Sequence, residues 1–289
     1  MSGVLNHPRS QELMSDNCTG DTLVIEAGKS HSRYLKDLWL YRELFIMLAW
    51  RDILVRYKQT IIGIAWSVLR PLLGMIAFTI VFGKIAKLPS GGIEYPLMVF
   101  SGMLVWQFFS NTVTSGGESL IGNANLISKV YFPRLVIPST SMIVSLADTL
   151  VGAVVFMPLL IYYHWTPSWR ILLLPAFLLL CAAISLGTAY IISSLNVKYR
   201  DFRYVIPFAM QLGIYVSPVG FSSEALPEKW RMAFSLNPLT GVIDGVRWAL
   251  FGTPPCQGSI AIATIFAILI LLLGYFSFRR MEREFADFI

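Results

Sequence analysis

Long apolar runs separated by short polar stretches dominate the residue pattern along this chain. Runs suited to membrane-spanning helices occupy 60–83, 96–115, 138–163, 171–195, 204–221 and 258–278. A hydrocarbon core of about 30 Å requires about 20 helical residues at a rise of about 1.5 Å each, and most of these runs have that length. The fifth run is shorter and contains Pro207 and Pro218, which leaves its ends poorly defined. The pattern predicts an all-α membrane protein with six transmembrane helices within residues 59–289.

Polar and mixed residues without periodicity occupy 1–30, which predicts a disordered cytoplasmic tail. This segment has no long apolar core, so we do not expect a secretory signal peptide. The next segment, 31–58, is apolar-rich but too highly charged to span a membrane. Its apolar residues recur on one helical stripe: Leu35, Leu38, Trp39, Ile46, Ala49, Trp50 and Ile53. A stripe of this kind with tryptophans and arginines predicts an amphipathic helix in the membrane interface.

A segment of intermediate polarity, 222–252, lies between the fifth and sixth runs. Its apolar residues recur at roughly helical spacing on both sides of Asn237 and Pro238, where the proline interrupts a helix. Two short helices that dip back into the outer leaflet would satisfy this pattern, so we expect a re-entrant hairpin. An exposed outer loop is the alternative. Asp244 and Arg247 lie within helical ion-pair reach, and we expect Arg247 to be hydrated near the outer boundary.

Composition excludes an ordinary soluble domain, because 55% of the residues are hydrophobic and only 14% are charged. The net charge of +6 comes from basic residues beside the apolar runs, so membrane topology explains it better than nucleic-acid binding. If both termini face the cytoplasm, 15 lysines and arginines flank the runs on the inside and six on the outside. This asymmetry predicts that both termini are cytoplasmic.

The residue types of enzyme and metal sites form no recognisable pattern. The three cysteines and three histidines are scattered, without a carboxylate at metal-ligand spacing, so we expect no metal site. The ending Gly28-Lys29-Ser30 is typical of a phosphate-binding loop, but Leu23 stands where the first glycine is required. No nucleophile is paired with a base. We therefore expect a chain that is not an enzyme, holds no cofactor and has no ATPase of its own.

A short basic and aromatic stretch, 125–139 (NLISKVYFPRLVIPS), lies between the second and third apolar runs. Its bulky and basic residues form a compact knob: Lys129, Tyr131, Phe132, Pro133 and Arg134. Pro133 and Pro138 bracket the point where a helix must restart. On the inner face, the segment 119–137 with this knob would suit contact with another subunit that acts on the membrane helices. An ordinary loop with two positive charges is the alternative.

Arg70 is the outlier among the apolar runs, because it lies far from both ends of the first one. A central arginine costs ~2.5–3.5 kcal/mol on insertion scales, so it normally faces a partner or a water-filled path. Asp148 in the third run is a plausible partner. An arginine that snorkels from a position near a helix end is the alternative.

Aromatic residues make up 13% of the chain, and several lie where they could line a path through the membrane: Trp66, Trp106, Phe108, Phe109, Tyr204, Phe208 and Tyr215. Aromatic faces can stack on the C–H faces of sugars and tolerate many different sugars in a sliding chain. Any one of these residues taken singly is more often lipid-facing or part of a core. Our candidate channel-lining residues are Trp66, Arg70, Tyr204, Phe208 and Tyr215.

Three stretches, in this order, resemble one family: 57–73 (YKQTIIGIAWSVLRPLL), 125–139 and 236–252 (LNPLTGVIDGVRWALFG). They are similar to the start of the first span, the cytoplasmic segment after the second span, and the Asn-Pro and Arg-Trp signature before the last span. The family is that of type-2 ABC exporter permeases for bacterial surface polysaccharides. With the six-run layout, the resemblance covers about residues 34–289, and the tail lies outside it.

The resemblance implies that two copies of the chain form a channel in the bacterial inner membrane and pair with two ATP-binding subunits, which hold ATP and Mg. It implies a polysaccharide substrate built on a polyprenyl diphosphate lipid. Among the exporters of this family, those for O-antigen are most similar, and capsule and teichoic acid remain possible substrates. The helix 34–56 and the knob would contact the ATP-binding subunits. The hairpin would gate the outer end, through Asn237, Pro238, Asp244, Arg247 and Trp248.

A lipid diphosphate is a dense anion, so basic residues at the inner surface are candidates to receive it. Arg51, Arg56 and Lys58 form one such group, and Arg200 and Arg203 a second. Arginine can hold phosphate oxygens in bidentate fashion. Anchoring by the positive-inside rule alone explains the same residues equally well.

Two hypotheses from other classes stay open. A secondary carrier would need internal repeats or intramembrane acids that couple ions, and neither is clear in this chain. A membrane-embedded glycosyl or lipid transferase would need acidic catalytic residues on a loop, where Asp201 and Glu224 are isolated candidates.

Overall fold

The computed structural model describes residues 38–58, 61–199, 201–223, 233–255 and 258–282, with only the backbone for 61–67. Every regular element within these ranges is helical, as the apolar pattern predicts. In chain order they are α2 (Arg42–Lys58), α3 (Ile61–Phe78), η1 (Thr79–Ile85), α4 (Tyr95–Gly122), α5 (Ala124–Lys129), α6 (Val136–Tyr162), η2 (Trp169–Leu173), α7 (Leu174–Lys198), α8 (Phe202–Val216), α10 (Pro238–Phe251) and α11 (Ser259–Met281). The tail expected at 1–30 lies outside the described residues.

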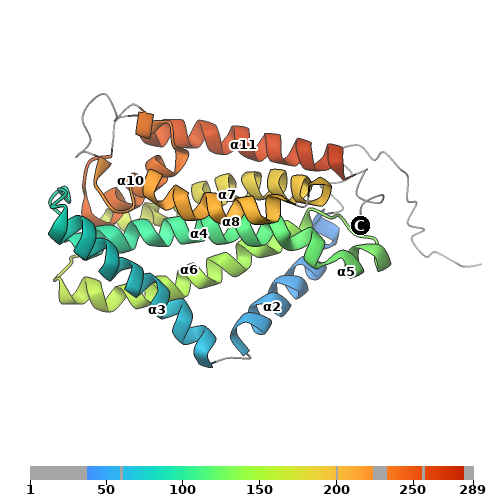
Figure 1. Cartoon of the computed structure of the whole chain (residues 1–289), viewed down its shortest axis with the longest axis horizontal. Helices are drawn as coiled ribbons and strands as arrows, with labels where there is room; N and C mark the ends of the chain where they lie inside the picture. Colours follow the sequence, from blue (N-terminus) through green and yellow to red (C-terminus); the bar gives the residue numbers. More distant parts are fainter. Residues whose placement is uncertain (1–37, 59–60, 200, 224–232, 256–257, 283–289) are drawn as a thin grey trace, which may run out of the picture.

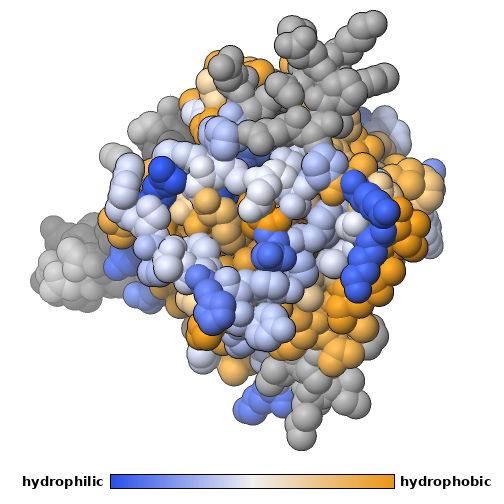
Figure 2. Space-filling view, turned by 90° about the vertical axis from the view of Figure 1, so that its left-hand side faces the viewer, coloured by the Kyte–Doolittle hydropathy of each residue, from blue (hydrophilic) through white to orange (hydrophobic). Residues whose placement is uncertain are grey.

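Helices α4, α6, α7, α8 and α11 run roughly along the long axis of the molecule and alternate in direction, whereas α2 and α3 run obliquely to them (Figure 1). At one end lie α5, the start of α6 and the end of α11, and we name this the α5 end. At the other end lie η1, η2 and α10, and we name this the α10 end. Viewed from the α10 end, hydrophilic residues gather towards the centre and hydrophobic residues lie on the flanks (Figure 2). This distribution suits an end in water and flanks in lipid.

Helix α4 is the centre of the bundle, because it packs against α6, α7 and α10 and has 16 of its 28 residues buried. Small residues allow the close contacts on which this packing depends. A Cβ at Gly187 of α7 would lie 2.5 Å from the Ile270 carbonyl oxygen of α11, and one at Gly274 would lie 2.3 Å from the Gly187 oxygen. Small residues bring helix backbones together in membranes, where burial from water does not drive association.

Four helical stretches are long and apolar enough to cross a membrane: Val68–Ile85, Val136–Tyr162, Trp169–Lys198 and Ser259–Met281. Helices also cover most of the runs expected at 96–115 and 204–221, but neither meets the same criterion. Helix α4 is long, and its glycines and hydroxyl side chains suit contact with neighbouring helices better than with lipid. Helix α8 has 15 residues, or about 22 Å, because it ends before Pro218. Length and composition thus support four of the six expected spans.

Helix α2 has two apolar faces instead of one stripe. Leu48 and Ala49 are buried against the bundle, whereas Trp50 is 60% exposed and Trp39, just before α2, is 73% exposed. The stripe predicted from the sequence is divided between these faces, so it does not identify the side that packs on the protein. The exposed tryptophans suit a helix whose outer face contacts the membrane.

Candidate functional site

At the α10 end, Asn237 and Pro238 begin α10 at the expected break. The Asn237 side chain accepts a hydrogen bond from the Leu239 N–H at 3.1 Å, and its amide donates to the Ser217 hydroxyl at 3.1 Å. Pro238 occupies the first turn, where its missing N–H leaves no helical bond unmade. Helix α10 then packs against α11, where a Cβ at Gly241 would lie 2.2 Å from the Ser259 carbonyl oxygen. Trp248 packs edge-on to Phe177, with ring centroids 6.5 Å apart.

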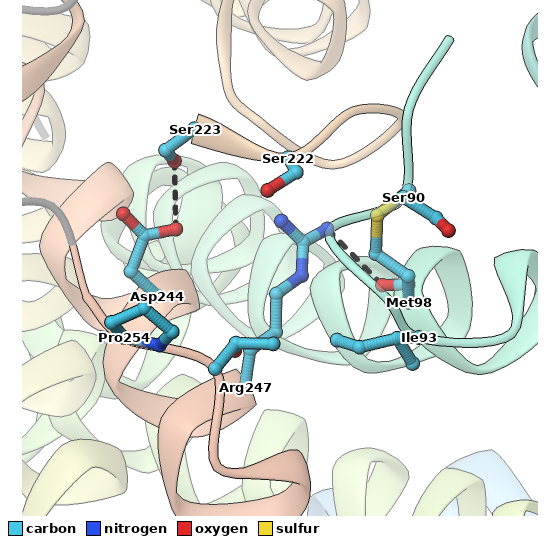
Figure 3. A pocket seen from close by; sticks show the side chains of 9 residues that line it. Ser90, Ile93, Met98, Ser222, Ser223, Asp244, Arg247 and Pro254 are labelled. Carbon is cyan, nitrogen blue, oxygen red and sulfur yellow. Dashed lines mark hydrogen bonds between the residues drawn. The ribbon is translucent and has the colours of Figure 1, made fainter. Parts of the chain in front are cut away.

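Arg247 is buried in the α10 end and binds three backbone carbonyl oxygens. Its guanidinium donates to the carbonyls of Phe221 at 3.1 Å, Val219 at 3.0 Å and Met98 at 3.1 Å (Figure 3 shows the last). The side chain is 3% exposed, so the expectation that Arg247 is hydrated was wrong. The carbonyl oxygens take the place of water, and the nearby Asp244 carboxylate supplies compensating negative charge.

The same contacts hold the segment after α8 against the bundle. Asp244 accepts a hydrogen bond from the Ser223 hydroxyl at 2.7 Å, and the Tyr95 hydroxyl donates to the Gly220 carbonyl (Figure 3 shows the first). We name residues 217–223 the α8–α10 strap. Arg247, Asp244 and Tyr95 fix this strap from two helices. The adjoining cavity is small, and its lining residues include Ser90, Ser222 and Thr253.

At the α5 end, the structure divides the predicted knob into an exposed and a buried half. Lys129 is exposed and Tyr131 is 54% exposed, whereas Phe132 is 4% exposed and Pro133 is buried. Phe132 belongs to a buried cluster with Leu48 of α2 and Leu120 of α4. The expectation that Phe132 projects towards a partner was therefore wrong. Its ring anchors the segment, and Lys129 and Tyr131 are the side chains available for contact.

Glu282, at the end of α11, holds this segment in place. Its carboxylate accepts the backbone N–H of Arg134 at 3.3 Å and the Arg279 guanidinium at 3.0 Å. The Arg134 guanidinium in turn donates to the Glu282 carbonyl at 3.0 Å. A negative charge beside the first turn of α6 is also favoured by the helix dipole. Sequence reasoning missed Glu282, since only its spacing from Arg279 is visible in the sequence and Arg134 lies 148 positions away.

We expect Glu282→Ala to speed hydrogen exchange of the Arg134 amide. Loss of a charge-assisted hydrogen bond reduces protection by about tenfold or more where local opening governs exchange. Hydrogen–deuterium exchange of the purified protein, read on peptides that cover 130–137, measures this effect. Arg280→Ala is the matched control because Arg280 is an exposed neighbour on the same helix. Equal exchange in the parent and Glu282→Ala would contradict the role given to Glu282.

Two of the basic residues expected to receive a diphosphate, Arg51 and Arg203, contact different acidic or amide side chains of the protein. Arg51 contacts Asp52 at 2.7 Å and donates to the Asn123 side chain at 3.2 Å. Arg203 lies 4.0 Å from Glu118. Lys58 is exposed at the end of α2, and Arg200 lies outside the described residues. Arg51 and Arg203 therefore do not share an acceptor in the described part of the chain.

Arg56 is the partner of Asp148. The two side chains form an ion pair at 2.7 Å, and the Tyr57 hydroxyl donates to the same carboxylate at 2.5 Å. The expected pairing of Asp148 with Arg70 was therefore wrong. Asp148 lies 12 residues beyond Val136, or about 18 Å along α6, so the end of α2 reaches the middle of that helix.

The candidate channel-lining residues divide between exposed surfaces and the core. Tyr204, Phe208 and Tyr215 of α8 are 77%, 62% and 59% exposed, and Arg70 of α3 is also exposed. Helices α3 and α8 meet near the α10 end, where the Phe78 and Tyr215 rings stack with centroids 5.9 Å apart. The other aromatics considered for this role are buried in α4: Trp106, Phe108 and Phe109. The Trp66 side chain lies outside the described part of the chain.

A family profile and the relatives found by comparison with known proteins agree with one another. The profile described as "ABC-2 type transporter" matches residues 43–251. The O-antigen export system permease protein RfbA of Myxococcus xanthus is 24% identical over 89% of this chain and 99% of its own length. An O-antigen export system permease protein RfbA of Klebsiella pneumoniae is 27% identical over 86% of this chain and 95% of its own. The polysialic acid transport protein KpsM of Escherichia coli is 22% identical over 80% of this chain and 91% of its own.

Proposed function

The chain belongs to the ABC-2 type transporter family, and from this premise we propose that it is the membrane permease subunit of an ATP-driven exporter of a bacterial surface polysaccharide. The observation that carries the proposal is similarity along almost the whole chain to relatives that share this role by name. The permease moves substrate and leaves ATP hydrolysis to a partner, which also holds ATP and Mg. It acts in the bacterial inner membrane.

The proposed topology has six crossing segments, with α4 and α8 as the second and fifth. The α5 end faces the cytoplasm and the α10 end faces outward. This orientation is supported by basic residues at the α5 end: Lys129, Arg134, Lys198, Arg203, Arg279 and Arg280. Both termini are cytoplasmic in this arrangement, and α10 with the α8–α10 strap forms the outer gate.

Two copies of the permease form the channel and pair with two ATP-binding subunits. Exposed aromatics on α8 and the exposed Arg70 on α3 support a surface that faces a path or a second copy instead of lipid alone. Exposed Lys129 and Tyr131 support contact with the ATP-binding subunit at the α5 end.

The proposed substrate is a polysaccharide on a polyprenyl diphosphate carrier, and O-antigen is the polymer that we favour. The names of the O-antigen permeases favour this polymer, whereas the weaker similarity to the polysialic acid transport protein keeps capsule as the alternative. Arg51, Arg56, Lys58, Arg200 and Arg203 are proposed to receive the diphosphate. Arg56 serves this role only if its pair with Asp148 opens, since that carboxylate occupies its guanidinium.

Co-purification tests this function. We expect an ATP-binding subunit from a neighbouring gene to co-elute with the chain in mild detergent, and proteoliposomes of the complex to move lipid-linked polysaccharide only with ATP. A hydrolysis-deficient ATP-binding subunit is the control. Transport driven by an ion gradient without a co-eluting subunit would favour a secondary carrier, and transfer of sugar or lipid to an acceptor would favour a transferase.

A further inference from the structure

Arg70 is an exposed cation without a counter-charge among the described residues. It is the tenth of the 18 residues of α3, and its neighbours Leu69 and Leu73 are 44% and 52% exposed. Across the described residues, no ion pair or hydrogen bond reaches the Arg70 side chain, which is not among the residues with further contacts. A charge in this position needs water or an anion, because hydrocarbon solvates it poorly.

The depth of Arg70 follows from a fixed point on α8. Phe78 stacks on Tyr215 close to the end of α8, and Arg70 lies eight residues before Phe78, or about 12 Å along α3. That distance is roughly half of the length of α8. Because α3 runs obliquely to α8 (Figure 1), Arg70 lies less than this distance in depth from the end of α8 that carries Tyr215, and farther from its other end.

In the described part of the chain, the carboxylates away from the helix ends already contact donors, so a second copy would present the same paired groups. Away from the helix ends, the described carboxylates are those of Asp52, Glu118, Asp148 and Asp244, and Asp52 binds Arg51. Glu118 lies opposite Arg203, Asp148 binds Arg56 and Tyr57, and Asp244 is buried with Ser223. A homodimer repeats the same contacts. Among the described residues, no carboxylate away from the helix ends is left without a donor to pair with Arg70, which favours an anion from outside the protein.

We propose that Arg70 binds the diphosphate of the lipid-linked substrate part of the way across the membrane. The inference rests on the proposed function and assigns one residue to its substrate. The surface around Arg70 matches both halves of such a ligand. An isoprenoid chain lies on the exposed leucines of α3, and the guanidinium donates in bidentate fashion to the phosphate oxygens. Sugars then meet the exposed aromatics of α8, which tolerate different residues.

The test places a cysteine one turn from Arg70, at Leu73, in a background without the three native cysteines. A water-soluble thiol reagent labels Leu73→Cys in permease reconstituted in neutral phosphatidylcholine nanodiscs. Farnesyl diphosphate is the probe and farnesol is its uncharged control. We expect the diphosphate to slow labelling about tenfold and farnesol to leave it unchanged. Arg70→Gln should remove this protection, while the exposed Arg280→Gln should keep it.

We expect Arg70→Gln to fold normally, because Arg70 has no described partner whose loss would destabilise the protein. A loss of protection in this variant would therefore not reflect misfolding. Protection that persists in Arg70→Gln would overturn the inference, and so would a Leu73→Cys thiol that the reagent never reaches. Equal protection by phosphatidylglycerol in the nanodisc would assign the site to lipid phosphates in general and overturn the substrate role. Arg70→Lys should retain part of the protection, since lysine keeps the positive charge but cannot donate two parallel hydrogen bonds to the phosphate.

Failure of this inference is distinguishable from failure of the proposed function. If the complex moves polysaccharide with ATP and Arg70→Gln does so at an unchanged rate, Arg70 has no role and the function stands. If the parent complex neither co-elutes with an ATP-binding subunit nor is protected by the diphosphate, the function itself fails. If the parent complex exports polysaccharide and Arg70→Gln, present in equal amount, exports at least tenfold less, the result supports both the role of Arg70 and the proposed function.

Discussion

Replacing Arg247 with methionine is expected to destabilise the permease by about 3–5 kcal/mol, because it leaves the Asp244 charge buried without its neighbour. The change also removes a donor from three carbonyl oxygens, those of Met98, Val219 and Phe221, of which the Met98 oxygen keeps the Ser101 hydroxyl. Methionine fills similar space, so loss of polar contacts dominates the effect. Unfolding in detergent, followed by temperature or denaturant, measures it. Arg280→Met is the control and should shift stability by less than about 0.5 kcal/mol, since Arg280 is exposed.

A double-mutant cycle separates the arginine from its carboxylate. Asp244→Asn removes the charge that Arg247 compensates, so Arg247→Met in that background should cost less than in the parent. The difference measures the coupling of the two side chains. Strictly additive losses would show that Arg247 acts through the strap carbonyls alone. Stability of Arg247→Met equal to that of the parent would contradict the whole account of the strap.

Local patterns predicted the helices, because a membrane helix is set by the composition of its own segment. Every apolar run contains a helix within its described residues, although α8 ends at Val216, and the proline at position 238 marks the start of α10. The lengths were less accurate where tertiary contacts intervene. The expected run 96–115 became a helix of 28 residues that continues into the knob segment, since its later residues are also buried in the bundle.

The contacts within the candidate site could not be predicted, because their partners are far apart in the sequence. The spacing of Asp244 and Arg247 was visible, but the carbonyl of Met98 lies 149 positions from Arg247. Backbone carbonyls carry no residue signature, so nothing in the sequence identifies them as acceptors. For the same reason Glu282 was missed, and Asp148 was considered as a partner of Arg70 although it pairs with Arg56. Two basic residues at different positions are equivalent in sequence until the fold shows which one reaches the carboxylate.

The burial of Phe132 beside an exposed Tyr131 has a direct consequence for mutagenesis. We expect Phe132→Ala to destabilise the protein by about 3–5 kcal/mol, since it opens a cavity among Leu48, Leu120 and Leu135. Loss of export in a variant that changes both rings would therefore not distinguish poor folding from poor coupling. Unfolding of purified Phe132→Ala measures the first effect, and an unchanged stability would show that the ring is not an anchor.

Tyr131→Ala isolates the coupling role. The ring is 54% exposed, so its removal should change stability by less than about 0.5 kcal/mol and leave the amount of protein in the membrane unchanged. Export should fall at least about tenfold, because an exposed aromatic at the centre of an interface commonly contributes 2 kcal/mol or more. ATP-dependent export and ATP hydrolysis, measured together in proteoliposomes, should show hydrolysis that persists while export is lost. Tyr162→Ala is the matched control, since this tyrosine is 75% exposed at the opposite end of the bundle. Equal export by Tyr131→Ala and Tyr162→Ala would exclude Tyr131 from transmission and leave Lys129 as the remaining exposed candidate.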